Sequence, residues 1–181
     1  MKKLLTLLIV FILCSAISVS AGAFDKGSKS ISGGISYTHL SGDAYYDTDI
    51  LELSPKVSLA ISHGFFVGGI IQVRSISADY SYGSYSDTQW QLGVITERYF
   101  VHEDETEKST IPFLKFSLMF SNDNSITQLS FGGNFGILKM VSESVGFDFG
   151  IKGSYDRFSA NSNSISGITL QAAIGVSSFI F

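Results

Sequence analysis

The sequence predicts an all-β chain in which eight antiparallel strands close into an up-and-down transmembrane β-barrel behind a cleaved signal peptide. Three observations favour this fold class. The chain starts with a short basic and apolar leader, and it ends in phenylalanine. Between these ends, eight segments alternate apolar residues with glycine and small polar residues, which is the two-residue period of a strand with unlike faces. Each segment has roughly the 9–11 residues that a tilted strand needs to cross a bilayer.

Residues 1–21 have the features of a secretory signal peptide. Met1, Lys2 and Lys3 form a basic start, an apolar run follows over 4–13, and small residues lead to Ala21. The apolar run is too short for a transmembrane helix. We therefore assign 1–21 to the signal peptide and 22–181, as one domain, to the barrel.

Cysteine content and charge exclude several classes of site and partner. Cys14 is the only cysteine and lies in the leader, so the mature chain has no disulfide and no cysteine metal site. Without the two leader lysines, the twelve basic residues become ten against sixteen acidic ones, a formal charge of −6. A nucleic-acid partner is not expected, because such proteins present a basic face.

The first four segments, 30–40, 50–62, 65–78 and 88–101, each place apolar residues on one parity. In the second we expect a β-bulge at Pro55, because proline cannot donate to a ladder. His63 and Gly64 then form a tight turn, since glycine accepts the positive φ of short hairpins. Phe66 and Ile70 interrupt the alternation of the third. The apolar positions are 31, 33, 35 and 37; 51, 53, 57, 59 and 61; 65, 67, 69, 71 and 73; and 90, 92 and 94.

The last four segments are 111–120, 126–138, 145–155 and 167–181. The seventh is the clearest, with Val145, Phe147, Phe149 and Ile151 on one parity and glycine, Asp148 and Lys152 on the other. In the eighth segment the apolar residues change from even to odd positions near its end, so we expect a bulge at 177–178. The apolar positions of the others are 114, 116, 118 and 120; 129, 131, 135 and 137; and 168, 170, 172, 174 and 176.

The connections predict an orientation. With the amino terminus on the periplasmic side, loops 41–49, 79–87, 121–125 and 159–166 are extracellular, and turns 63–64, 102–110 and 139–144 are periplasmic. Tyrosines in the first two loops make these loops candidates for binding an extracellular partner, because tyrosine offers rigid amphipathic contact area. Hydrated tips beside lipopolysaccharide sugars are the alternative.

The polar parity favours an apolar face that meets lipid. It consists mainly of glycine, serine, glutamine and asparagine, which suit the cramped interior of an eight-stranded barrel. Aromatic rings near the strand ends favour the headgroup level of a membrane. A soluble, secreted, lipocalin-like barrel with an apolar ligand inside is the inverse arrangement and stays an alternative. The aromatic residues near strand ends are Tyr37, Trp90, Tyr99, Phe100, Phe120, Tyr155 and Phe179.

The leader, the eight alternating segments and the terminal Phe181 with Phe179 resemble the small barrels of the OmpA transmembrane-domain and OmpX type. These belong to a porin-like family of the Gram-negative cell envelope. The resemblance implies a place in the outer membrane, among lipid and lipopolysaccharide. It also implies that the barrel-assembly machinery recognises Phe179 and Phe181 as an assembly signal.

Charged residues on the inward parity predict an ion-pair network that fills the lumen and leaves no open pore. A path for protons or ions through the lumen is the more specific alternative. We predict no cofactor and no metal site, because no pair of histidines has ligand spacing. The predicted lumen charges are Glu52, Lys56, Arg74, Glu97, Lys115, Asp148 and Lys152.

His39 and Ser41 carry one enzyme hypothesis. A His-x-Ser pair beside an acid is similar to the pair that some outer-membrane lipid A deacylases use, and Asp43, Asp47 or Asp49 could supply the acid. A serine nucleophile needs a base, and the base needs an orienting partner. The family's asparagine after the serine is replaced by Gly42. Our first interpretation is therefore a non-enzymatic outer-membrane protein with a structural or surface-interaction role, and a lipid-modifying enzyme is the alternative.

Overall fold

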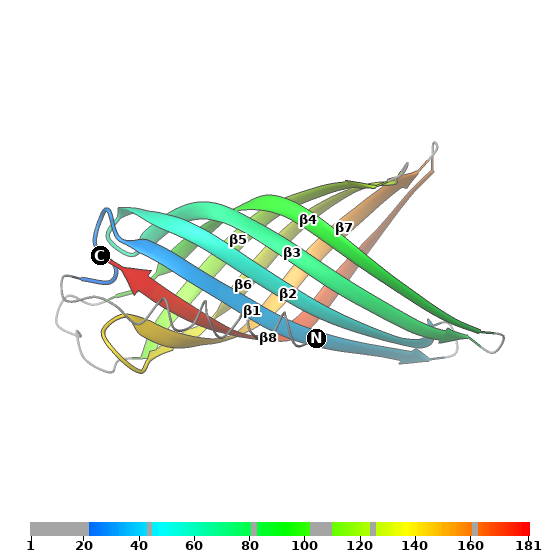
Figure 1. Cartoon of the computed structure of the whole chain (residues 1–181), viewed down its shortest axis with the longest axis horizontal. Coiled ribbons are helices and arrows are strands. Elements are labelled where there is room, and N and C mark those ends of the chain that lie inside the picture. Colours follow the sequence, from blue (N-terminus) through cyan, green and yellow to red (C-terminus); the bar gives the residue numbers. More distant parts are fainter. Residues whose placement is uncertain (1–21, 43–44, 81–82, 102–109, 124–125, 161–162) are drawn as a thin grey trace, which may run out of the picture.

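The computed structural model describes residues 22–42, 45–80, 83–101, 110–123, 126–160 and 163–181. Its strands form one closed antiparallel barrel in which each strand pairs with its neighbours in sequence and β8 pairs with β1 (Figure 1). This confirms the predicted eight-stranded antiparallel up-and-down barrel. The predicted signal peptide, 1–21, lies outside the described residues. No helix in the described part of the chain is long and apolar enough to cross a membrane. The strands are β1 Lys29–Gly42, β2 Tyr45–Ser62, β3 Phe65–Tyr80, β4 Gly83–Tyr99, β5 Thr110–Asp123, β6 Ile126–Met140, β7 Val145–Ala160 and β8 Asn163–Ile180.

The strands are longer than the sequence predicted, and most of the predicted outer loops are strand. β2 and β8 each have 18 residues, and the hairpins continue to within two residues of their tips. The segments at 41–49, 79–87, 121–125 and 159–166 are rich in turn-forming residues. The loop prediction was wrong there because adjacent chain segments satisfy each other's backbone groups whatever the side chains.

Two predicted bulges are also absent. β1 and β2 stay in register through the Gly33–Pro55 pair, and the β2–β3 ladder only skips two residues there without shifting. The β2 bulge lies instead between Ala60 and Ser62. β8 likewise stays in register with β1 up to the Phe179–Ser30 pair, so Phe179 keeps the inward parity.

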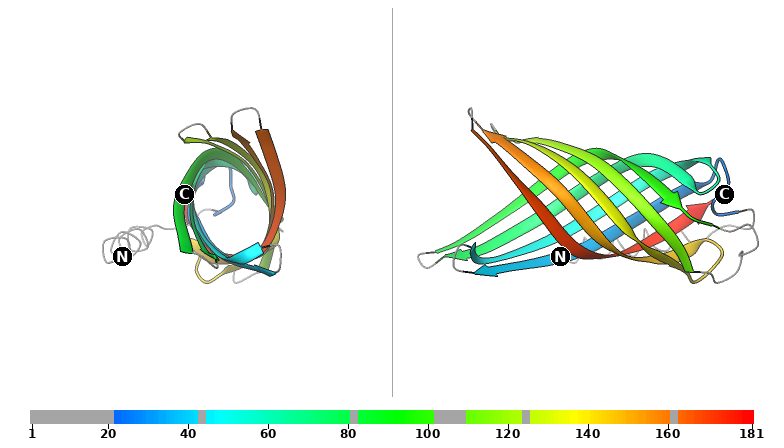
Figure 2. Two further views of the ribbon diagram at one scale, coloured as in Figure 1. Left: turned by 90° about the vertical axis from the view of Figure 1, so that its right-hand side faces the viewer. Right: turned by 180° about the vertical axis from the view of Figure 1, so that it is seen from behind.

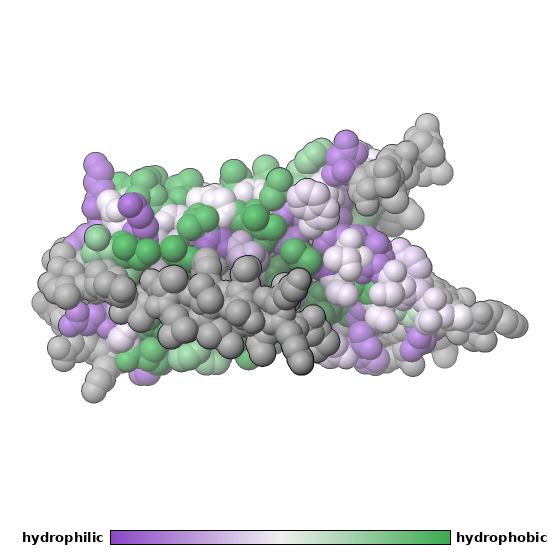
Figure 3. All heavy atoms as spheres, in the orientation of Figure 1, coloured by the Kyte–Doolittle hydropathy of each residue, from purple (hydrophilic) through white to green (hydrophobic). Residues whose placement is uncertain are grey.

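Apolar side chains form a band around the outside of the barrel. Val57 is 58% exposed, whereas the neighbouring Lys56 on the same strand is 9% exposed and faces the lumen. Figure 3 shows this band on one face, with polar residues beyond it. The arrangement excludes the lipocalin-like alternative, which needs its apolar face inside. The exposed apolar residues of the band include Ile35, Leu51, Val57, Leu59, Ile61, Val67, Ile71, Trp90, Leu92, Val94, Phe116, Leu118, Phe120, Leu129, Phe131, Phe135, Ile137, Phe147, Phe149, Ile151, Ile168, Leu170 and Ile174.

The two ends of the barrel differ, and we call them the terminal end and the arm end. At the arm end β1–β8 pairing stops at Ser36–Ala173, and β4–β5 pairing stops at Leu92–Phe120. Pairing within β1–β4 and within β5–β8 continues further, to Tyr80–Gly83 in the case of β3 and β4. The barrel wall therefore divides there into two arms, β1–β4 and β5–β8, which splay apart in Figures 1 and 2.

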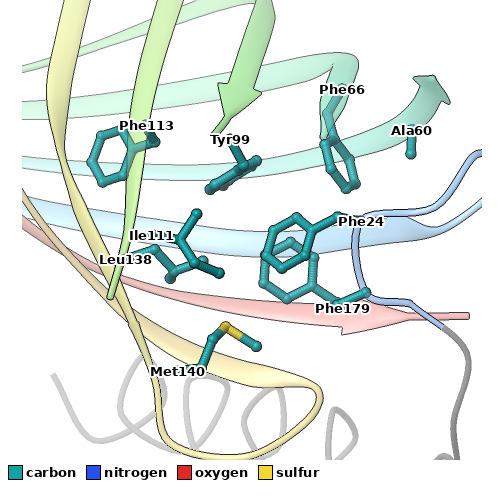
Figure 4. Close-up of a cluster of buried hydrophobic side chains, with 10 residues drawn as sticks. Phe24, Ala60, Phe66, Tyr99, Ile111, Phe113, Leu138, Met140 and Phe179 are labelled. Carbon is teal, nitrogen blue, oxygen red and sulfur yellow. The ribbon is translucent and has the colours of Figure 1, made fainter. Parts of the chain in front are cut away.

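A cluster of buried apolar side chains fills the terminal end (Figure 4). Phe24 enters it from the segment before β1 and is 6% exposed, with its ring 4.9 Å from that of Phe179 and 5.3 Å from that of Tyr99. Gly64 donates its amide to the Phe24 carbonyl, and its own carbonyl accepts the Tyr99 amide. Phe66, which interrupts the alternation in the sequence, points inward to this cluster. The members are Ala23, Phe24, Ala60, Phe66, Tyr99, Ile111, Phe113, Leu138, Met140 and Phe179.

Candidate functional site

Charged side chains from facing strands meet inside the barrel, and the first cluster surrounds Glu97. Its side chain is fully buried. The carboxylate accepts Lys56 Nζ at 2.6 Å and Ser58 Oγ at 2.8 Å, and Lys115 Nζ lies 3.4 Å away. Tyr99 donates its phenol hydrogen to the same carboxylate at 3.1 Å. The contacts join β2, β4 and β5 across the lumen.

Lys115 extends this cluster to a second acid. Its ammonium donates to Asp148 Oδ2 at 2.8 Å, and Ser177 Oγ donates to that oxygen at 2.9 Å. The same ammonium lies 4.1 Å from the centroid of the Phe113 ring. Lys115 thus links Glu97 on β4 with Asp148 on β7, and its side chain is only 3% exposed.

The second cluster surrounds Glu52. Lys152 pairs with Glu52 Oε1 from across the lumen, and Arg74 Nη2 lies 3.4 Å from Oε2. Gln72 and Gln171 donate amide hydrogens to Oε2 at 2.8 and 3.5 Å. The structure therefore places all seven predicted lumen charges inside the barrel and divides them between two ion-paired clusters.

Asp156 is an inward carboxylate that the predicted network lacks. It is 4% exposed and accepts hydrogen bonds from Ser130, Ser154 and Gln128. The predicted strand stops at Tyr155, one residue short of it. In the sequence Asp156 lies on the same polar parity as Asp148 and Lys152, but it is not among the predicted lumen charges. With it, four acids face four bases.

A cavity of about 60 Å³ lies between the two clusters, lined by charged side chains of both clusters together with small and apolar residues. The charged residues of its wall are Glu52, Lys56, Lys115, Asp148 and Lys152. Its volume is more than the roughly 10–15 Å³ that a cavity needs to hold one water. Buried polar atoms without a protein partner in the described chain, including Ser36 Oγ, Asn134 Oδ1 and Asp148 Oδ1, belong to residues of its wall. Buried water normally satisfies such groups, so we expect water beside these atoms in a cavity whose wall also contains apolar residues such as Ile70 and Ile95.

His39 lies on the outer surface, at the arm side of the apolar band. Its Nδ1 is 2.8 Å from Asp49 Oδ1, and Tyr37 donates its phenol hydrogen to the same oxygen at 2.6 Å. The hydrogen bond from Tyr37, followed by that from His39, lowers the pKa of Asp49, which lies beyond the apolar part of β2. Asp49 is thus the acid beside His39. The side chains of Ser41, Asp43 and Asp47 lie outside the described part of the structure, and so does any contact between Ser41 and His39.

The two aromatic residues at the carboxyl terminus, Phe179 and Phe181, differ in how deeply they are buried. Phe179 is 1% exposed and belongs to the terminal cluster, facing the lumen and not lipid. Phe181 follows the last strand and is partly buried against the same cluster. Tyr99, expected at the headgroup level, also points inward.

In the described ranges, no group of three or more histidine, cysteine, aspartate or glutamate side chains is arranged to hold a metal ion. His63 contacts a single acid, Asp25, at 3.0 Å on the surface of the terminal end. His102 lies outside the described residues.

Comparison with known proteins adds a structural likeness. No family model matches the sequence, and no curated protein matches it. Among solved structures, it is similar to the "Solid-state NMR structure of outer membrane protein AlkL in DMPC lipid bilayers". The match covers 91% of this chain and 94% of that one, at 11% identity and a TM-score of 0.35. The barrel is defined by the strand pairing of this chain.

Proposed function

We propose that this protein is an integral outer-membrane β-barrel of a Gram-negative cell envelope, non-enzymatic, with a structural or surface-interaction role like that of OmpA/OmpX-type barrels. The observation that carries the proposal is the closed ladder with an apolar outer band and a polar interior. In lipid every backbone polar group needs an internal partner, and a closed barrel provides one for each. In water, the same band would be an aggregation-prone surface far larger than soluble monomers tolerate.

The lengths of the strands support a surface role. About 9–11 residues of a tilted strand cross the hydrocarbon, whereas β4 has 17 residues and β8 has 18. The excess lies in the arms, where outward positions such as Ser75, Ser77, Ser84 and Ser86 are exposed and polar. The arms therefore project from the membrane, on the extracellular side if the terminal end faces the periplasm. Tyr85 is 50% exposed there and is a contact for an extracellular partner or for lipopolysaccharide.

The terminal cluster supports a lumen that does not conduct. Phe24, Phe66, Tyr99 and Phe179 pack ring to ring across that end, and the two ion clusters fill the middle. Planar-bilayer recordings of the mature barrel should give no steady conductance. Stable single-channel steps in the wild-type protein would contradict the closed lumen and favour the ion-path alternative.

Location is tested by fractionation and refolding. The mature chain should co-purify with outer-membrane lipid, and it should need detergent or lipid to stay monomeric. Its folded form should migrate differently from the boiled form on a denaturing gel. A monomer that stays soluble without detergent would contradict the membrane assignment.

Recognition by the barrel-assembly machinery has to precede folding, because Phe179 is buried in the finished barrel. Replacing Phe179 with alanine therefore affects two steps, recognition and terminal packing. Refolding of purified Phe179→Ala in detergent, without any machinery, separates them. If recognition matters, membrane insertion in cells should fall more than the yield of refolding does.

The lipid-modifying enzyme remains the second candidate because Asp49 orients His39 through Nδ1 and leaves Nε2 for a substrate or nucleophile. Mass spectra of lipid A from cells that express wild type, His39→Ala or His63→Ala decide between the two. His63 is a matched control, since it also contacts one acid but lies at the opposite end. Unchanged lipid A in all three strains supports the non-enzymatic role. Loss of an acyl chain that depends on His39 alone would establish the enzyme.

A further inference from the structure

The charged side chains that point outward at the terminal end are all basic in the described strands. Lys29 is the first residue of β1, and Arg98 and Lys139 are the next-to-last residues of β4 and β6. Each is exposed and continues the outward parity of its strand past the apolar band. On the arm side of the band, the outward charges include two acids, Asp49 and Asp79. We call Lys29, Arg98 and Lys139 the basic collar.

Two contacts hold the guanidinium of Arg98 in place. Its Nη1 donates to the carbonyl oxygen of His63 at 2.8 Å, and its Cζ lies 6.0 Å from the centroid of the exposed Phe100 ring. A guanidinium has five N–H donors in a planar fork, and the contact with His63 uses one of them. Among the described residues, no carboxylate pairs with Arg98. The fork is therefore oriented at the edge of the apolar band and keeps donors for an anion.

The basic collar lies next to side chains that meet the hydrocarbon. Lys29 pairs with Leu59 in the β1–β2 ladder, and Leu59 is an exposed member of the apolar band. Ile137, two residues before Lys139, is another. Figure 3 shows hydrophilic side chains next to the band at this end. Long basic side chains in such a place lay their apolar stems along the hydrocarbon and raise the charge to the level of the headgroups.

We infer that the basic collar binds the phosphate groups of anionic phospholipids in the leaflet at the terminal end, with Arg98 as the principal contact. The arginine fork matches two phosphate oxygens at once, whereas each lysine supplies a point charge. The formal charge of the whole chain is −4, so a non-specific attraction of the protein for anions would not produce this preference. The inference rests on the proposed function, because it needs the barrel to lie in a membrane.

Spin-labelled lipids provide the test. The complete mature chain, which includes the acidic segment 102–109 outside the described residues, is inserted into phosphatidylcholine vesicles. These contain a trace of spin-labelled phosphatidylglycerol or of spin-labelled phosphatidylcholine. Electron paramagnetic resonance separates the label held at the barrel from the label in the bulk bilayer and gives a relative association constant. Wild type should prefer phosphatidylglycerol by roughly three- to five-fold at low salt, and about 0.5 M NaCl should bring the ratio close to unity by screening.

Arg98→Gln should lower this preference by about two-fold or more. Arg98→Lys should give an intermediate value, because lysine keeps the charge without the fork. Arg157→Gln is the matched control, since it removes the same charge from an exposed outward position on the arm side of β7, and it should keep the wild-type preference. If Arg98→Gln does not insert, the double variant Lys29→Gln with Lys139→Gln decides, and its preference should fall as well.

The outcomes separate the collar from the membrane assignment. An inserted wild-type barrel that holds both lipids equally would overturn the collar and leave the membrane assignment in place. Losses of equal size in Arg98→Gln and Arg157→Gln would also overturn it, and so would a preference that persists at high salt. A mature chain that does not enter vesicles at all would overturn both.

Discussion

Replacing Lys115 with methionine is expected to be the most damaging single change of a lumen charge. Methionine keeps most of the length of the side chain and removes the ammonium. Asp148 then retains only the Ser177 hydroxyl, because its Oδ1 already has no partner in the described chain. Glu97 keeps Lys56 and Ser58, so one buried carboxylate, not two, loses its base.

The expected loss follows from these contacts. Removing one partner of a buried pair costs about 3–5 kcal/mol of unfolding free energy, since the other charge stays buried. Arg74→Met should cost less, about 1–2 kcal/mol, because Glu52 keeps Lys152 and its hydrogen bond from Gln72. Lys29→Met, at an exposed position on β1, should stay within about 0.5 kcal/mol.

Reversible urea unfolding in lipid vesicles, followed by Trp90 fluorescence, measures all three variants. A double variant, Lys115→Met with Asp148→Leu, removes both charges and should be more stable than Lys115→Met alone. Equal losses for Lys115→Met and Lys29→Met would refute the network as a source of stability. Asp148→Leu alone completes the cycle. A loss in the double variant equal to the sum of the two single losses would show that Lys115 and Asp148 do not interact.

Three further changes test the terminal end and the outer cluster. Phe24→Ala should lower the unfolding free energy by about 3 kcal/mol in the same urea assay, the cost of emptying a buried aromatic site. Gly64→Ala should cost at least about 2 kcal/mol, because Gly64 has a φ of +65° and an added Cβ would lie 2.4 Å from a backbone oxygen; Gly167→Ala, with open space around it, should be near neutral. Hydrogen bonds lower the pKa of Asp49, so its contribution to stability is complete above the usual aspartate pKa and is lost as the pH falls through the lowered value. Tyr37→Phe should raise that pKa and move the loss to higher pH, which an NMR titration of the carboxyl carbon measures.

The terminal end was only partly predictable from the sequence. Phe66 and Phe179 lie on the inward parity of their strands, and this alone would have placed them in the lumen. The predicted bulge at 177–178 assigned Phe179 to the outer face. That prediction treated the terminal aromatic residues as an assembly signal that faces lipid. Phe24 lies before the first strand, where no alternation exists to give its direction.

The sequence by itself determined the number of strands, the apolar outer face and the seven charges that point inward. Each follows from the alternation of side chains between the two faces of a strand, and this alternation can be read from the residues of that strand alone. The tertiary structure alone decided which charges pair, where strands end and which acid lacks a base. Ion pairs such as Lys152–Glu52 join residues far apart in the chain, and the stagger of a closed barrel sets which ones meet. The ends of a strand also depend on the neighbouring strand. A segment rich in Asp and Tyr forms a strand wherever an adjacent segment pairs with its backbone N–H and C=O groups.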